Sequence, residues 1–142
     1  IKVFIGWDSR EDIAFQVAKH SIKKHNPDVQ VYPLKLPTLQ ELGVYTRGVD
    51  AKASTEFTFS RFFVPMLTGY KGWALFIDCD FLCMTDIGEL FKQANDNYAV
   101  MVAKHDYTPK EGTKMDGKQQ LPYPRKNWSS CMLWNCEHPS NK

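Results

Sequence analysis

Residues 73–80 have the sequence WALFIDCD, an apolar run followed by Asp78, Cys79 and Asp80. A short apolar run without polar alternation is typical of a strand that is buried on both faces of a sheet. Charges at the end of such a strand need solvent or a partner, and carboxylates two residues apart point to the same side of an extended chain. Because the pair repels itself without a cation, the sequence predicts a divalent metal at the mouth of a sheet, and phosphate chemistry there.

Apolar segments before this strand predict a parallel sheet. Residues 2–7, KVFIGW, have the composition of an opening strand, and residues 29–36 have that of a second strand. Between them, apolar positions at helical spacing predict a helix over residues 9–25, with residues 9–12 as a capping box at its start. A strand, a helix and another strand in this order favour a right-handed parallel crossover.

The remaining segments extend this α/β pattern. Ligands of such sheets bind at the carboxyl ends of the strands. Asp8 follows the first predicted strand, and Asp78 and Asp80 follow the central one. His105 and Asp106 follow another, so we expect one shared site. The other predicted elements are a loop with a short helix over residues 37–52, a helix over 54–67 that Pro65 kinks or divides, a short helix over 86–94, a strand over 98–103, a long exposed loop over 108–125 and a final strand over 129–134.

Composition indicates one globular domain and argues against several functions. The chain has 142 residues, of which 43% are hydrophobic and 24% charged, which fits a folded soluble protein. A net charge of +2 without a Lys/Arg block argues against nucleic-acid binding, and the apolar runs are too short for a transmembrane segment. None of the four cysteines forms a Cys-x-x-Cys pair, so we expect buried thiols in a reducing compartment. The expected location is the cytoplasm, either free or peripheral to a membrane.

The order of segments around Asp78 and Asp80 resembles that of one enzyme family. An Arg-containing segment, residues 54–67, precedes the strand, and residues 86–91, DIGELF, follow it as a short helix with an acid and a leucine. With the opening strand and Asp8, this order resembles glycosyltransferase family 8. That family comprises retaining nucleotide-sugar transferases of the GT-A fold, glycogenin and bacterial lipopolysaccharide galactosyltransferases among them. Asp-x-Asp alone is weakly specific, whereas the ordered set is more specific.

This resemblance implies a fold, a reaction and partners. The fold is the α/β GT-A type, a mostly parallel sheet flanked by helices, as a single domain over residues 1–142. The reaction is the metal-dependent transfer of a hexose from a nucleotide-sugar donor, UDP-linked, to a carbohydrate or glycoconjugate acceptor, with retention at the anomeric carbon. Family members are longer than this chain, which is therefore expected to be either a minimal relative or the N-terminal part of a longer transferase.

The resemblance also assigns the metal and nucleotide contacts. Asp78 and Asp80 would hold Mn²⁺ or Mg²⁺, which stabilises the charge that builds on the departing nucleoside diphosphate. Asp78 matches the acid that reaches the ribose, and Asp8 matches the residue that meets the base. Gly6 and Trp7 would allow close backbone approach or stacking there. The alternatives are a helix N-cap for Asp8, and a solvated or helix-capping pair for the two acids.

Two further residues match family positions near the sugars. Arg61 matches an arginine near the donor sugar and phosphates, where a guanidinium fork suits oxygen atoms; the alternative is a surface arginine. Asp106 matches an acid near the acceptor, a place that His105 could take instead, and a polar loop start is the alternative. The resemblance supplies no catalytic nucleophile, so the catalytic residue stays unassigned, and the expected path is attack on the donor face that the phosphate leaves.

Residues 127–135 resemble the family's Phe-Asn-Ser-Gly strand, which lines the sugar pocket. The match assigns Asn127 and Ser129 to the donor sugar or acceptor. This chain departs from the pattern, because Trp128 stands in the Asn place and Ser130 in the Gly place. The identity of the sugar is therefore not given by the resemblance.

Two competing functions stay open at this point. Family 8 enzymes usually complete the metal site with a downstream histidine, but His138 is too near Asp80 in sequence to be assigned. A non-catalytic nucleotide-sugar-binding relative is therefore one alternative. The other is a haloacid-dehalogenase-like phosphatase, in which Asp78 would be the nucleophile. That motif normally has Thr or Val where Leu82 stands, and it normally lies near the start of a chain.

Overall fold

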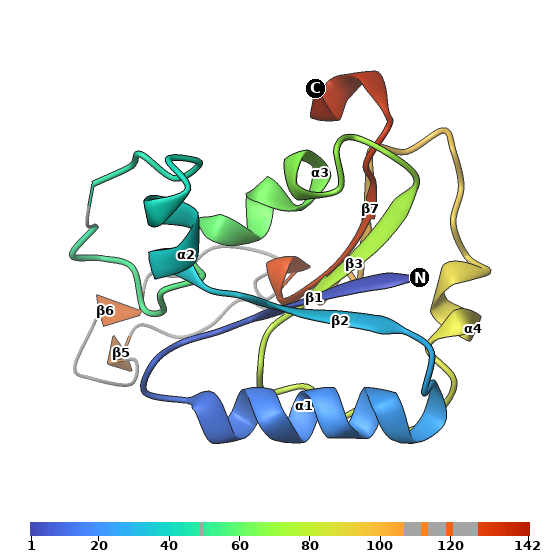
Figure 1. Cartoon of the computed structure of the whole chain (residues 1–142), viewed down its shortest axis with the longest axis horizontal. Helices are drawn as coiled ribbons and strands as arrows, with labels where there is room; N and C mark the ends of the chain where they lie inside the picture. Colours follow the sequence, from blue (N-terminus) through green and yellow to red (C-terminus); the bar gives the residue numbers. More distant parts are fainter. Residues whose placement is uncertain (49, 107–111, 114–118, 121–127) are drawn as a thin grey trace.

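The computed structural model describes residues 1–48, 50–106, 112–113, 119–120 and 128–142. Within these residues the centre is a five-stranded sheet with strand order β2-β1-β3-β7-β4. Helix α1 lies on one side of the sheet, and α2 and α3 lie on the other (Figure 1). The strands of this sheet are β1 (Lys2–Gly6), β2 (Gln30–Leu34), β3 (Trp73–Ile77), β4 (Val100–Val102) and β7 (Cys131–Asn135). A separate short pair, β5 (Gly112–Thr113) and β6 (Gln119–Gln120), is antiparallel.

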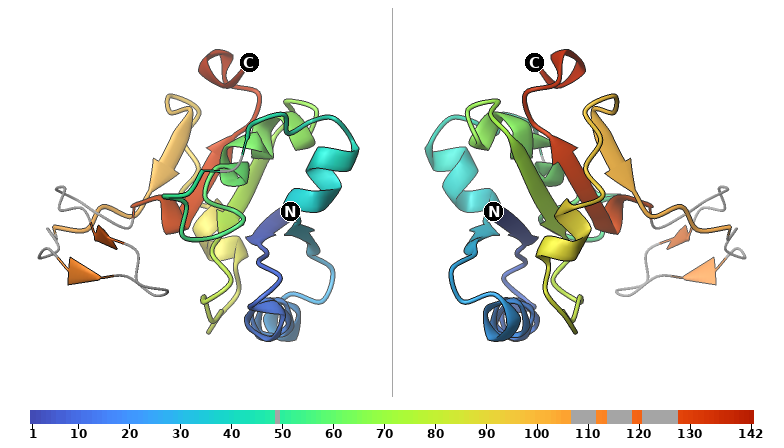
Figure 2. Two further views of the ribbon diagram at one scale, coloured as in Figure 1. Left: turned by 90° about the vertical axis from the view of Figure 1, so that its left-hand side faces the viewer. Right: turned by 90° about the vertical axis from the view of Figure 1, so that its right-hand side faces the viewer.

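The central sheet is mixed, and only in part parallel. β1 pairs in parallel with β2 and β3, as the strand–helix–strand pattern predicts. β7 lies between β3 and β4 and is antiparallel to both, which corrects the mostly parallel sheet expected from the sequence. The physical reason is that β7 begins at the same end of the sheet at which β4 ends. Two antiparallel strands can be joined without a helical crossover. Figure 2 shows β7 and β4 side by side.

The apolar runs form the core as predicted. In β1, Val3, Phe4 and Ile5 are all buried, and in β3 the four residues after Trp73 are buried. Both strands therefore bury side chains on both faces of the sheet, which explains why neither alternates with polar residues. Helix α1 (Asp12–His25) covers one face with Phe15, Ala18 and Ile22.

The helices are shorter than expected. Glu11 is the N-cap of α1 and its side chain makes no cap hydrogen bond, so residues 9–12 are not a capping box. The predicted helix over 54–67 is instead a series of turns, a 3₁₀ turn η1 (Ser60–Phe63) and α3 (Val64–Leu67). Pro65 lies in the first turn of α3, where its missing N–H costs nothing. The other helical elements among the described residues are α2 (Leu36–Glu41), α4 (Gly88–Phe91) and the 3₁₀ turns Trp128–Ser130 and Pro139–Asn141.

Local side-chain hydrogen bonds explain why residues before η1 do not form a helix. The Thr58 hydroxyl donates to the Thr55 carbonyl (2.9 Å), and the Thr55 amide donates to that hydroxyl (3.2 Å). These bonds give the backbone an alternative to the helical ladder. Asp86 behaves similarly before α4, where its carboxylate accepts from the Gly88 amide (2.7 Å) one residue earlier than a helix cap would lie.

Two sequence expectations concern the chain as a whole. No helix among the described residues is long and apolar enough to cross a membrane. All four cysteines are free thiols, and Cys79 and Cys136 are buried. Most of the predicted loop over 108–125 lies outside the described residues.

Candidate functional site

The polar residues that were predicted from the sequence lie at one end of the sheet, which is the carboxyl end of its parallel strands. Asp8 follows β1 and Asp78 follows β3, and these strands are parallel neighbours. Ser129 precedes β7, whose first residue pairs with the last residue of β3, so it lies at the same edge. Asp106 follows β4, which runs parallel to β3 because both are antiparallel to β7. These residues therefore lie at the same end of the sheet, and the expectation that they form one shared site stays a prediction.

Asp8 is fully buried and held by a dense set of hydrogen bonds. Arg10 donates from Nε to Oδ1 and from its terminal nitrogen to Oδ2, each at 2.9 Å, and its backbone amide also donates to Oδ1 (3.0 Å). The Glu56 amide donates to Oδ2 (3.1 Å). The hydrogen bonds from Arg10 lower the pKa of Asp8 to about 2, in spite of its burial. Asp8 is therefore ionised at neutral pH, and its side chain does not cap α1.

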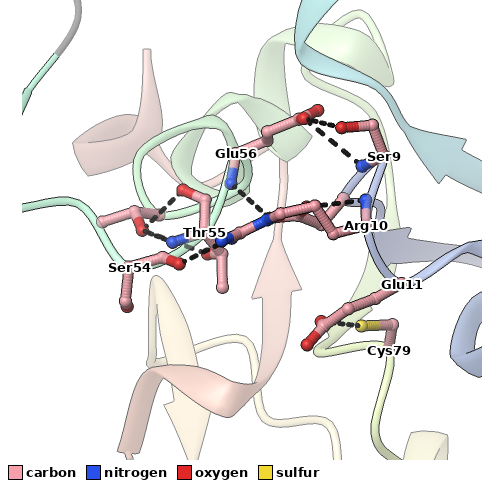
Figure 3. Close-up of polar contacts among 9 residues, drawn as sticks. Ser9, Arg10, Glu11, Ser54, Thr55, Glu56 and Cys79 are labelled. Atoms are coloured by element: carbon pink, nitrogen blue, oxygen red, sulfur yellow. Dashed lines mark hydrogen bonds and ion pairs between the residues drawn. The ribbon is translucent and has the colours of Figure 1, made fainter. Parts of the chain in front are cut away.

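The same contacts join two segments that are far apart in the sequence (Figure 3). Arg10 donates to the Ser54 carbonyl (3.1 Å). The Ser9 hydroxyl and amide both donate to Glu56 Oε1, at 2.5 and 3.3 Å. We call these contacts between residues 8–10 and 54–56 the clasp. Sequence reasoning missed Arg10 and Glu56, since no local pattern relates Glu56 to the segment of Ser9, which lies 47 positions before it.

Gly6 and Trp7 have structural partners of their own. A side chain at Gly6 would place its Cβ 2.5 Å from the Phe57 ring, so the close approach that this glycine allows is packing by Phe57. The Trp7 indole donates to Asp12 (2.8 Å), and the Lys35 ammonium lies 4.5 Å from the centre of a Trp7 ring. The predicted contacts of Gly6 and Trp7 with a nucleotide stay predictions.

Arg61 is brought together with Asp78 and Ser129. Its Nη1 lies 3.0 Å from Asp78 Oδ1 and donates to the Ser129 carbonyl (2.7 Å) and hydroxyl (3.3 Å). The guanidinium carbon lies over the rings of Phe57 (5.4 Å) and Phe76 (5.0 Å). Only 7% of Arg61 is exposed, so the alternative of a surface arginine is wrong. A buried guanidinium with apolar rings below it is a strong, oriented donor.

Asp78 has the electrostatics expected of a cation ligand. Burial above all, with the charges of Asp80 and Glu11, raises its pKa to about 7 against the opposing effect of Arg61. Ionising an acid with a raised pKa costs free energy in the free protein. A bound cation would offset that cost, and the acid would release its proton. Asp80 is exposed, and its charge is close enough to Asp78 to raise the pKa of that residue.

The residues present fit a hard divalent cation that keeps several other ligands. Asp78 and Asp80 offer carboxylate oxygens, which Mn²⁺ and Mg²⁺ prefer. Among the described residues, no group of three or more His, Cys, Asp or Glu side chains could together hold a metal ion. Mg²⁺-type ions commonly use one or two carboxylates and complete their shell with water and phosphate oxygens, so two protein ligands suffice for a phosphate-bridged ion.

Glu11 is a further acid near this pair that the sequence analysis did not assign. Its Oε2 accepts from the Cys79 thiol (3.4 Å), as Figure 3 shows. Burial, followed by this hydrogen bond, raises the pKa of Cys79 to about 12, so the thiol stays protonated and is a poor nucleophile. Glu11 adds negative potential beside Asp78.

The remaining predicted sugar contacts are less well defined. His105 and Asp106 are exposed beyond the end of β4. Asn127 lies outside the described residues. Trp128 is 37% exposed, and its ring centre lies 6.5 Å from that of Phe62. Among those sugar-pocket residues that the structure describes, Arg61 and Ser129 are in direct contact with each other.

A pocket of about 490 Å³ adjoins the clasp. Arg10 and Glu56 line it from the clasp, and Tyr45, Arg47 and Phe59 line it from the chain between α2 and η1. The Arg47 guanidinium lies 4.0 Å from the centre of the Phe59 ring. Asp78 and Asp80 are not among the lining residues. The pocket and the carboxylate pair are thus separate parts of the site, one beside Asp8 and the other at the end of β3.

Comparisons with known proteins support this fold. No family model matches the chain. Protein CDI of Arabidopsis thaliana is 53% identical to this chain over an alignment of 142 positions, which covers 99% of this chain and 55% of that protein. The chain therefore spans about half the length of the curated relative that it matches.

The chain also resembles solved structures of glycosyltransferases. The bifunctional glycosyltransferase WbbM matches 97% of this chain with a TM-score of 0.65 at 17% identity, over 32% of its own length. GlyE of Streptococcus pneumoniae TIGR4 matches 96% with TM-scores of 0.54 (apo form) and 0.56, at 16% and 15% identity, over 34% of its length. At these identities the likeness concerns the fold: this mixed α/β domain has a fold that also occurs within glycosyltransferases.

Proposed function

We propose that this chain is the donor-binding domain of a metal-dependent glycosyltransferase of the GT-A type, related to family 8. The observation that carries the proposal is the Asp78–Arg61 pair. A carboxylate with a raised pKa and a buried guanidinium meet at the carboxyl end of β3, with Asp80 two residues on. This combination suits a ligand that brings both a cation and phosphate oxygens. The fold shared with WbbM and GlyE supports the same proposal.

In this proposal the donor is a nucleotide sugar, UDP-linked, and the metal is Mn²⁺ or Mg²⁺. Asp78 and Asp80 would hold the ion, which when bound supplies charge stabilisation for the departing diphosphate. Arg61 would donate to a phosphate or sugar oxygen from its fixed place above Phe57 and Phe76. Because its contacts with Ser129 already orient it, this donor loses little conformational entropy on binding.

The nucleoside would lie beside Asp8, where the pocket offers space and polar groups. Asp8 is ionised at neutral pH and buried, and it already accepts four hydrogen bonds from Arg10 and Glu56, so in this proposal it positions these two residues, which line the pocket. Trp7, next in the chain, is fixed by Asp12 and Lys35 and presents an aromatic surface near the same edge. We assign the sugar and a carbohydrate or glycoconjugate acceptor to the side of Arg61, Ser129 and the segment after β4, where Asp106 lies.

The test is calorimetric titration with UDP, GDP and their sugars, with and without Mn²⁺. We expect UDP binding that requires Mn²⁺ and that weakens by about tenfold or more in Asp80→Ala, because one of two protein ligands is lost. Asp28→Ala is the matched control, since Asp28 is an exposed acid at the opposite edge, between α1 and β2. Nucleotide binding that is absent, or that Asp80→Ala leaves unchanged, contradicts the proposal.

The same preparation separates the alternatives. Transfer or hydrolysis of the nucleotide sugar supports an enzyme, whereas Mn²⁺-dependent UDP binding without turnover supports a non-catalytic relative. Hydrolysis of p-nitrophenyl phosphate that Asp78→Asn abolishes, without nucleotide binding, would instead support a phosphatase with Asp78 as its nucleophile.

A further inference from the structure

Two exposed aromatic side chains lie together beside the Arg61–Ser129 contact. Phe62 is 46% exposed and Trp128 is 37% exposed, and their ring centres are 6.5 Å apart with the planes inclined at 56°. Large apolar side chains are more often buried, so two that meet at the surface and remain partly open suggest a binding surface. We call Phe62 and Trp128 the aromatic pair.

The aromatic pair is anchored to the core. The Phe62 ring lies 6.3 Å from Trp134 in an edge-on arrangement at 81°, and Trp134 is a buried residue of β7. Phe62 belongs to η1 and Trp128 to the 3₁₀ turn that leads into β7, so short regular elements carry both. Aromatic side chains have few rotatable bonds, and an edge-on contact with a core residue restricts Phe62 further. The pair therefore offers a preorganised surface.

Its position connects the pair to the candidate donor site. In the chain, Arg61 precedes Phe62 and Ser129 follows Trp128. Arg61 Nη1 donates to the Ser129 carbonyl at 2.7 Å. Arg61 also pairs with Asp78 at 3.0 Å. The polar groups one residue along the chain from the aromatic pair, namely the Ser129 hydroxyl and the Arg61–Asp78 pair, are the hydrogen-bonding partners that we assign to a ligand on this pair.

We propose that Phe62 and Trp128 bind the C–H face of a pyranose ring of a carbohydrate. The C–H groups of a pyranose carry small positive charge and match the negative face of an aromatic ring, while its hydroxyl groups need hydrogen-bond partners at the rim. The aromatic pair beside Ser129 and Arg61 offers both. A flat nucleobase would stack on one ring alone, because the two planes are inclined rather than parallel.

The inference rests on the proposed function only in that the carbohydrate would be the donor sugar or the acceptor. Trp128 stands where the resemblance to family 8 would place an asparagine, so the surface belongs to this chain and is not a transferred family contact. An indole in that place exchanges a hydrogen-bonding amide for an apolar stacking face. Selection among sugars would then depend on which ring faces are free of axial hydroxyl groups.

The test is saturation-transfer NMR and tryptophan fluorescence of the whole chain with oligosaccharides of glucose, galactose, mannose, xylose and N-acetylglucosamine. We expect at least one of them to bind, and its affinity to fall by about tenfold in Trp128→Ala and in Phe62→Ala. Trp128→Phe should retain much of the binding, because it keeps an aromatic face. Tyr98→Ala, which removes an aromatic residue 55% exposed on the chain before β4, should leave binding unchanged.

The outcomes separate this inference from the proposed function. If none of the oligosaccharides binds, or if Tyr98→Ala weakens binding as much as Trp128→Ala, the inference is overturned. It is also overturned if uridine, and no carbohydrate, depends on Trp128. Mn²⁺-dependent UDP binding, measured in the same variants, reports on the proposed function alone. Loss of carbohydrate binding in the aromatic variants of a protein that fails to bind UDP would support the inference and contradict the donor-site proposal.

Discussion

Arg61 has contacts with three parts of the site, and this makes it the residue on which the geometry depends most. Its Nε donates to the Phe57 carbonyl (3.3 Å), and its Nη1 reaches Ser129 and Asp78. A lysine ammonium could not reproduce this divergent set of donors, because they require a planar fork. The side chain therefore holds the η1 segment, the start of β7 and the end of β3 in register.

The first prediction concerns the charge of Asp78 when Arg61 is removed. Arg61 lowers the pKa of Asp78, and burial raises it to about 7. In Arg61→Met the lowering contribution disappears while most of the burial remains, so the pKa of Asp78 should rise above about 7. Carbon-13 NMR titration of the Asp78 carboxyl group measures it directly. Arg47→Met is the control, because Arg47 lies over Phe59 and not beside Asp78. An unchanged or lower pKa would refute the role assigned to Arg61.

At the scale of elements, sequence reasoning found the five strands of the central sheet, but it missed β5 and β6 and the contacts that hold the strands together. The uninterrupted apolar runs of β1 and β3 were sufficient, because burial on both faces leaves a distinct composition. The place of β7 between β3 and β4 was not predictable, since strand order depends on pairing between distant residues. The helix expected over residues 54–67 does not form around Thr55 and Thr58, because the Thr58 hydroxyl makes hydrogen bonds with the Thr55 backbone instead.

The candidate site divides in the same way. Asp78 and Asp80 were visible because a charged pair ends an apolar strand, and Arg61 because its segment resembles a known family. Arg10 and Glu56 were not visible, because their importance arises only when β1 and the segment before η1 come together in space. Local sequence patterns thus identify residues at the ends of strands and helices. Tertiary contacts determine which other residues keep these residues in position.

The clasp gives a prediction at this scale. Glu56→Gln keeps the amide that donates to Asp8 but weakens the acceptor used by both Ser9 groups. We expect the free energy of unfolding to fall by about 1–2 kcal/mol, since a carboxylate acceptor is replaced by a neutral one. UDP affinity should fall as well, because Glu56 lines the pocket and Ser9 would hold it less firmly.

Urea denaturation and calorimetry measure the two effects. Glu41→Gln is the matched control: Glu41 is an exposed acid at the end of α2, outside the clasp, and its replacement should change neither quantity. If Glu56→Gln and Glu41→Gln behave alike, the clasp does not position the pocket.

For the whole molecule, two aspartates make opposite contributions to stability as pH changes. Asp8 has a folded pKa of about 2, below the ordinary aspartate value of 3.8, so it stabilises the fold above pH 3.8, and that contribution of about 2 kcal/mol disappears as pH falls through 2. Asp78 has a folded pKa of about 7, above 3.8, so the folded state holds its proton more tightly. Its contribution is present below pH 3.8 and is lost as pH rises through 7.

The raised pKa of Asp78 leads to a prediction for metal binding. The ion would bind the ionised form of Asp78, so protons compete with it below the pKa of about 7. Apparent Mn²⁺ affinity in the presence of UDP should therefore be roughly twentyfold weaker at pH 5.5 than at pH 7.5. Calorimetry in buffers of different ionisation enthalpy would also detect about one proton released per ion at pH 5.5. In Asp78→Asn, binding should be weak at both pH values and should release no proton from this position. Equal affinity at the two pH values in the unmodified protein would mean that Asp78 is not the ligand that controls the ion.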